Sequence, residues 1–165
     1  MPKVDNNIVI ENARIGFRNF SGAAGKYNTA GSRNFCVFLE YELGEVLEKD
    51  GWNVRWLEPR DPEDIRQPYL QVALNYNNFP PKIALVSSKG KTRLDETSIS
   101  ILDWAEIENV DLIIRPYNLE VNGKTGVKAY VKSMFVTLEE DELDTKYMDV
   151  PDSAANSLKG LDDED

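Results

Sequence analysis

Hydrophobic and polar residues alternate along much of this chain, which is the pattern of β-strands. The runs that alternate or are continuously apolar cover residues 8–20, 33–39, 52–57, 69–76, 82–88 and 110–138. Residues 41–50 instead place their apolar side chains at helical spacing, and Gly51 follows as a helix stop. A second short helix is expected within residues 95–107. We therefore predict a mainly β protein with one or two short helices, in which the strands at 69–76 and 82–88 pair as a hairpin.

The longest alternating stretch, residues 110–138, predicts a long β-hairpin. Its turn contains Asn122-Gly123, the favoured dipeptide for a tight turn in which both central residues have positive φ. The loop holds two residues or four, so the partner of Tyr117 is Lys128 or Tyr130. In either register, directly opposed residues share a face of the hairpin. One surface therefore gathers the side chains of Arg115, Tyr117, Lys128, Tyr130 and Lys132.

A sheet face on which aromatic and cationic side chains interleave has the chemistry for binding single-stranded nucleic acid. Flat rings stack on bases, and cations neutralise phosphates. One alternative is an ordinary solvated face on which the tyrosines only fill gaps. Another is that the tyrosines point into the core. Residues 21–32, rich in glycine and other small residues, form an expected mobile loop. Beside and within it, Lys26, Tyr27 and Arg33 could form an arm that closes over a bound strand.

The apolar positions of the last strand change parity along its length. They are odd-numbered at first (Val127, Ala129, Val131) and even-numbered later (Met134, Val136, Leu138). A β-bulge or sharp bend near Ser133 explains this change, and bent strands let a small sheet curl into a barrel. Together with the many short strands, this pattern predicts a small antiparallel barrel of the oligonucleotide/oligosaccharide-binding (OB) type.

The net charge of −10 is distributed unevenly along the chain. Residues 139–165 hold 11 acidic residues and two lysines, which leaves 18 acidic and 17 basic residues in residues 1–138. The body is nearly neutral and can carry a cationic face. We expect one domain over residues 1–143 and a disordered acidic tail over residues 144–165. The tail either only solubilises the protein or recruits partner proteins through its last residues, Asp162, Asp163, Glu164 and Asp165.

The chain has no histidine and a single cysteine, Cys36, inside an apolar run. These counts remove histidine-dependent catalysis, zinc sites and disulfide frameworks, so we expect a buried thiol, no cofactor and no metal. A magnesium-dependent nuclease would have to use the carboxylates Asp95, Glu96, Asp103 and Glu106, whose spacing fits no motif. No run approaches the roughly 18 apolar residues that span a bilayer, and the N-terminus lacks a signal-peptide layout. We expect a cytoplasmic protein without a membrane partner.

Three segments resemble single-stranded DNA (ssDNA) binding proteins of tailed bacteriophages: KYNTAGSRNFCVFL, DGWNVRWL and NVDLIIRPYNLEVNGKTGVKAYVKSMFVTLEEDEL. The resemblance implies an OB-fold core that coats ssDNA in phage replication or recombination, often as an oligomer. It also implies an acidic C-terminal tail for replication partners. Tails of this type often end in an aromatic or apolar residue, whereas this sequence ends LDDED.

The main hypothesis is therefore a non-enzymatic, sequence-tolerant ssDNA-binding protein located in the host bacterial cytoplasm. The first alternative is a structural or interaction protein of a phage, whose sheet face binds another protein. The nuclease ranks last.

Overall fold

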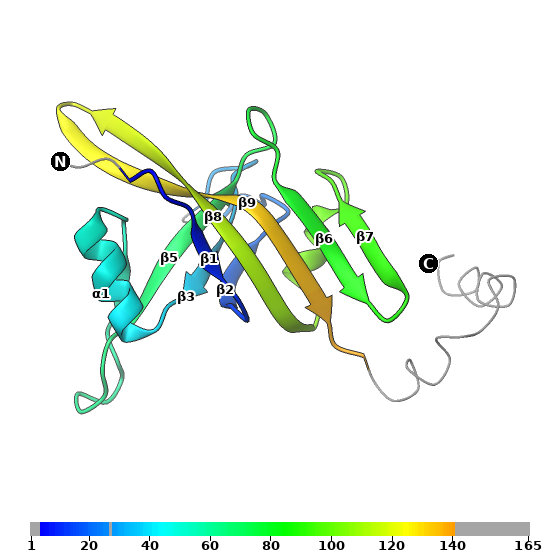
Figure 1. Cartoon of the computed structure of the whole chain (residues 1–165), viewed down its shortest axis with the longest axis horizontal. Coiled ribbons are helices and arrows are strands. Elements are labelled where there is room, and N and C mark those ends of the chain that lie inside the picture. The colour runs from blue at the N-terminus through cyan, green and yellow to red at the C-terminus, as the bar shows by residue number, and fades with distance from the viewer. Residues whose placement is uncertain (1–3, 27, 141–165) are drawn as a thin grey trace, which may run out of the picture.

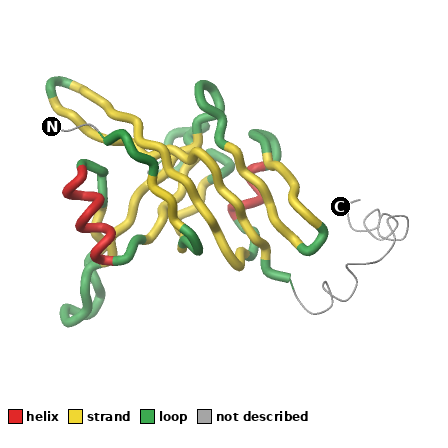
Figure 2. Tube along the Cα trace, viewed as in Figure 1, coloured by secondary structure: helices red, strands yellow, loops and turns green. Residues whose placement is uncertain are grey.

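Nine strands, one α-helix and one 3₁₀ helix make up the part of the chain that the computed structural model describes, residues 4–26 and 28–140. The elements are β1 (Ile8–Ile10), β2 (Arg14–Asn19), β3 (Arg33–Phe38), α1 (Tyr41–Asp50), β4 (Arg55–Leu57), β5 (Gln67–Leu74), β6 (Lys82–Ser87), β7 (Gly90–Leu94), the 3₁₀ helix η1 (Ile99–Asp103), β8 (Ile107–Val121) and β9 (Lys124–Leu138). Strands dominate, and α1 lies to one side of the sheet (Figure 2). The expected mainly β fold class is confirmed, but the described strands do not close into the small antiparallel barrel that the sequence predicted.

All nine strands belong to one sheet, whose main path runs β1-β8-β9-β5-β3-β2. The short strand β4 pairs with β5. Strand β6 pairs with β9, and β7 pairs with β6 (Figure 1). Most pairs are antiparallel, but β9 is parallel to both β5 and β6. Among the described residues the path does not close, because β1 and β2 at its two ends do not pair with each other. The backbone N–H of Ala13, between these strands, donates to the carbonyl of Val110 at 2.7 Å and ties this corner to β8.

The long hairpin of β8 and β9 forms as expected, and its tip projects beyond the rest of the sheet (Figure 1). Val121 pairs with Lys124, so the turn holds two residues, Asn122 and Gly123, whose φ angles are 54° and 79°. Both are positive, as this turn type requires. The expected bulge also forms, because the register shifts between the pairs of Ile113 and Ile114 and leaves Lys132 as the extra residue of β9.

The core lies on the face of the sheet that holds the alternating apolar residues of β3, β5, β8 and β9. It includes Phe35, Val37, Leu70, Val72, Leu112, Ile114, Val131 and Met134. Helix α1 buries Leu47 and Gly44, and Gly44 lies so close to Pro68 that a Cβ there would stand 2.5 Å from the proline ring. The same pattern of alternation therefore leaves one face of these strands outside the core.

Two details of the sequence-based topology are wrong. The strands at β5 and β6 do not pair with each other, because each lies parallel to a different segment of β9, and β6 forms its hairpin with β7 instead. The first predicted strand is divided in two, because the chain turns at Asn12, whose φ is 51°. The expected helix within residues 95–107 is the short 3₁₀ helix η1. Among the described residues, no helix is long and apolar enough to cross a membrane.

Candidate nucleic-acid interface

Four of the predicted site residues come together on the hairpin, where Arg115 pairs with Tyr130 and Tyr117 pairs with Lys128. We call these four the hairpin cluster. The intervening residue Ala129 is buried, so the cluster lies on the face opposite the core. The rings of Tyr117 and Tyr130 meet edge to face at a centroid distance of 6.0 Å, and Tyr117 is 50% exposed. The tyrosines therefore lie on the outer face of the sheet rather than in the core.

The cations of the hairpin cluster rest on aromatic rings. The guanidinium carbon of Arg115 lies 4.2 Å from the ring centroid of Phe79 and 5.9 Å from that of Tyr130. The Nζ atom of Lys128 lies 5.2 Å from the Tyr130 centroid. Within residues 4–26 and 28–140, neither cation forms an ion pair with a carboxylate. Both charges therefore remain available to an anionic ligand.

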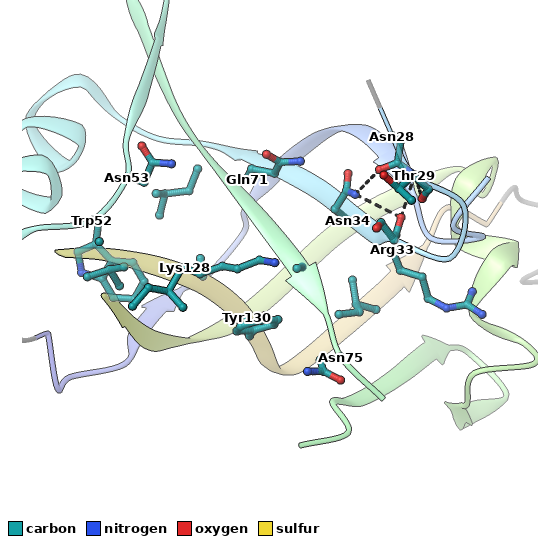
Figure 3. A pocket seen from close by; sticks show the side chains of 18 of the residues that line it. Asn28, Thr29, Arg33, Asn34, Trp52, Asn53, Gln71, Asn75, Lys128 and Tyr130 are labelled. Atoms are coloured by element: carbon teal, nitrogen blue, oxygen red, sulfur yellow. Dashed lines mark hydrogen bonds between the residues drawn. The ribbon is translucent and has the colours of Figure 1, made fainter. Parts of the chain in front are cut away.

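A groove of about 790 Å³ adjoins the hairpin cluster on the outer face of β9, β5 and β3. Figure 3 shows Lys128 and Tyr130 from β9, Gln71 from β5, and Asn34 from β3 around it. The side-chain amide of Gln71 can both donate and accept hydrogen bonds, whereas Asn34 Nδ2 already donates to Asn28 Oδ1 and to the Ser32 carbonyl, which leaves Asn34 Oδ1 as an acceptor. The groove thus combines a ring, a cation and neutral polar groups, which suits the mixed chemistry of a nucleotide chain.

The loop before β3 is held by a network of amide hydrogen bonds. Asn28 Nδ2 donates to the carbonyls of Ala23, Thr29 and Ser32, and Asn34 Nδ2 donates to Asn28 Oδ1 at 2.9 Å (Figure 3). The sequence predicted a mobile arm here, and nothing in its glycine-rich composition indicated these bonds. The closing of this loop over a bound strand stays a prediction.

The other predicted site residues differ in their surroundings. Arg33 is largely buried: its guanidinium donates to the Phe20 carbonyl at 2.7 Å and lies 3.8 Å from a Glu96 carboxylate oxygen. Lys26 is exposed, and so is Lys132 in the bulge, where it has no partner residue on β8. Tyr27 and the tail residues Asp162, Asp163, Glu164 and Asp165 lie outside the described residues, as does the expected boundary at residue 144.

Three of the four carboxylates considered for a nuclease, those of Asp95, Glu96 and Asp103, have structural partners. Asp95 accepts hydrogen bonds from Thr97 and Ser98, which lower the pKa of its carboxyl group. Asp103 accepts from the backbone N–H groups of Phe20 and Ser21 and so joins η1 to the end of β2. In the part of the chain that is described, no three histidine, cysteine, aspartate or glutamate side chains group as metal ligands.

The phage ssDNA-binding domain family has a sequence model that matches residues 2–165, almost the whole chain. The chain belongs to this family. The resemblance inferred from the three sequence segments is therefore confirmed. No curated protein matches the chain.

The family assignment agrees with a fold comparison. The structure of the ssDNA-binding protein from bacteriophage Enc34 in complex with ssDNA is 11% identical, with a TM-score of 0.51, and the match covers 86% of this chain and 95% of that one. Two further structures of the Enc34 protein also match at 11% identity, each over 86% of this chain. The C-terminal truncation has a TM-score of 0.48, and 95% of its chain is covered; the other structure has a TM-score of 0.49, and 89% of its chain is covered. At this identity, the match to the complex shows a shared fold.

The sequence indicated the residues of the hairpin cluster but not the other residues of the candidate interface, Phe79, Gln71 and Asn34. Phe79 is 59% exposed and comes from the loop between β5 and β6, which no turn motif links to the hairpin. Gln71 and Asn34 reach the groove because β5 pairs with both β9 and β3. The alternation of β5 and β3 separates outward from inward residues, so these two amides could have been found once the strand order was known.

Proposed function

We propose that this protein binds ssDNA without sequence preference, along the hairpin cluster and the adjoining groove, and catalyses no reaction. The observation that carries the proposal is the interleaving of the Tyr117, Tyr130 and Phe79 rings with the charges of Arg115 and Lys128. Membership of the phage ssDNA-binding domain family supports it, as does the fold shared with a protein whose structure contains ssDNA.

The chemistry of this face is tolerant of base identity. Every base presents a π-face, so stacking on a tyrosine or phenylalanine contributes about 1–3 kcal/mol per base with little preference among bases. Arg115 and Lys128 neutralise phosphates, whose spacing does not depend on sequence. The Gln71 amide accepts or donates according to the group that faces it, and Asn34 Oδ1 accepts. The result is an interface that follows a flexible strand rather than reading its sequence.

Fluorescence titration with oligo-dT at several salt concentrations tests this proposal. Tyr130→Ala removes a stacking ring and Lys128→Glu reverses a charge, so both should weaken binding, the latter most at low salt. Lys49→Glu, on the exposed side of α1, is the matched control and should change affinity little. Wild-type affinity in both Tyr130→Ala and Lys128→Glu would refute the hairpin face. A wild-type protein that binds a partner protein but no oligonucleotide would support an interaction role instead.

We further propose that the protein acts in phage DNA replication or recombination in the bacterial cytoplasm. Its acidic C-terminal segment, residues 144–165, would compete with DNA for the cationic face and recruit replication proteins through Asp162, Asp163, Glu164 and Asp165. The concentration of 11 acidic residues after residue 138 supports this role. Deletion of residues 148–165 should tighten ssDNA binding at low salt, and equal affinities of the truncated and full chains would count against competition. Sedimentation of the full chain tests for a homo-oligomer.

A further inference from the structure

A second group of aromatic rings, one exposed and two half-buried, lies on the same outer face, at the far side of the groove. Phe17 from β2, Phe38 from β3 and Tyr69 from β5 have pairwise centroid distances of 6.0 to 6.4 Å. The guanidinium carbon of Arg14 lies 5.8 Å from the Phe38 centroid, and Arg55 is paired with Tyr69 across β4 and β5. We call these five residues the distal cluster.

Strand pairing places the distal cluster and the hairpin cluster on one continuous surface. Tyr69 pairs with Phe38, and Phe38 pairs with Arg14, so these three share a face. On β5 the same face continues from Tyr69 through Gln71 to Ala73, which pairs with Tyr130 of the hairpin cluster. Tyr69 and Tyr130 are about 14 Å apart, because they are separated by four residues along β5 and by one strand spacing across the sheet. The polar groove lies over this interval.

Phe17 reaches this face only because the backbone departs from regular β structure. Alternation from Ile15 would direct Phe17 into the core, where burial of a phenylalanine is worth about 1.5–3 kcal/mol. Instead, the register of β2 and β3 shifts between Gly16 and Asn19, the φ angle of Phe17 is 48°, and the side chain is 64% exposed. A bulky residue with positive φ is an outlier of the kind that gathers at functional sites.

A neighbouring glycine adapts the surface to these rings. A Cβ at Gly16 would stand 2.7 Å from the Phe38 ring, so the missing side chain lets this ring lie over β2. Arg14 donates to the Gln67 side chain at 3.3 Å, and neither Arg14 nor Arg55 forms an ion pair with a described carboxylate. The distal cluster therefore repeats the chemistry of the hairpin cluster, with aromatic rings beside cations that pair with no described carboxylate.

We propose that the distal cluster is a second stacking site for the same DNA strand that binds the hairpin cluster. The strand crosses β9, β5 and β3, passes Gln71 and Asn34, and stacks a further base on Phe17 while Arg14 and Arg55 neutralise phosphates. This inference rests on the proposed function. The charge of the two arginines and the continuity with the groove favour a nucleic-acid strand over an apolar protein segment as the occupant.

Binding measured against oligonucleotide length tests the distal cluster. We expect the affinity of the wild-type protein for oligo-dT to rise as the length increases from about 4 to about 16 nucleotides, the range of OB-fold site sizes. Phe17→Leu should lower affinity for the long oligonucleotides by about 5- to 150-fold, the equivalent of one lost stacking contact. The loss for the shortest should be much smaller, because a short strand can occupy the hairpin cluster alone.

Two further variants separate stacking from a merely structural effect. Phe17→Trp keeps a ring, so it should retain the affinity of the wild-type protein for long oligonucleotides and show quenched tryptophan fluorescence on binding. Arg14→Ala should reduce the salt dependence of long-strand binding while leaving urea unfolding nearly unchanged. Ile65→Ala removes an exposed apolar side chain outside the face and is the matched control.

The outcomes distinguish this inference from the proposed function. If Tyr117→Ala weakens binding but Phe17→Leu and Arg14→Ala do not at any length, the distal site is refuted and the hairpin interface stands. If Phe17→Leu alters self-association in sedimentation without altering DNA affinity, the cluster is an interface between copies and the inference is also overturned. If the wild-type protein binds no oligonucleotide, the proposed function itself fails.

Discussion

Replacement of Lys128 by alanine should reduce the salt dependence of ssDNA binding by one phosphate contact. Lys128 is exposed on the hairpin cluster, and no described carboxylate pairs with it. A cation that neutralises one phosphate of a single strand contributes about −0.7 to the slope of log K against log salt. Over a rise from about 50 to about 200 mM salt, the affinity advantage of the wild-type protein over Lys128→Ala should shrink by about 2.6-fold.

Titrations with one oligo-dT at four or more salt concentrations measure this slope directly. The slope is more informative than a single affinity, because Lys128 also contacts the Tyr130 ring and its removal could shift that ring. Lys128→Arg should keep the slope of the wild-type protein, and Lys49→Ala on α1 serves as the exposed-lysine control. A slope unchanged in Lys128→Ala would show that this lysine meets no phosphate, which would refute the assigned path of the strand over β9.

Three predictions concern the body of the protein. Burial raises the pKa of the Cys36 thiol to about 11, so alkylation at pH 8 should be about 100-fold slower in the folded chain than in urea; equal rates would contradict this. Gly44→Ala should lower the free energy of unfolding by about 1–2 kcal/mol, because the clash with Pro68 outweighs the gain in helix propensity, whereas Glu45→Ala on the solvent side should change it little. Tyr76→Phe should raise the free energy of unfolding by about 1 kcal/mol, because the Tyr76 hydroxyl is buried without a described hydrogen-bond partner. A lower free energy of unfolding in this variant would indicate that a bridging group satisfies the hydroxyl.

The features that the sequence predicted correctly are local ones. The hairpin follows from a two-residue turn signal flanked by alternation, and the bulge follows from a parity change within one strand. Each of these signals lies within the same strand or hairpin that it predicts. The pairing of β5 and β6 was mispredicted because their true partner, β9, is distant in sequence and parallel. Parallel pairs are joined by crossovers rather than by tight turns, so no local turn signal marks them.

The site residues differ in predictability for the same reason. Arg115, Tyr117, Lys128 and Tyr130 were found together because one hairpin register relates them. Phe79 was not, because its contact with Arg115 depends on the path of a loop. Simple alternation from Ile15 would place Phe17 on the apolar face of its strand, and its exposure comes from a backbone irregularity that alternation cannot anticipate.

The different partners of two arginines explain how a chain of net charge −10 can present a cationic face. Arg33 is held by the Phe20 carbonyl and the Glu96 carboxylate, so its charge is largely compensated within the fold. Arg115 instead lies against the rings of Phe79 and Tyr130, which position the guanidinium without neutralising it. At physiological salt, exposed charges more than about 8 Å apart are largely screened, so a phosphate on the hairpin responds mainly to the charges within that distance. Whether a lysine or arginine can bind DNA is therefore decided by its immediate partners, and net charge alone cannot identify the cations that do so.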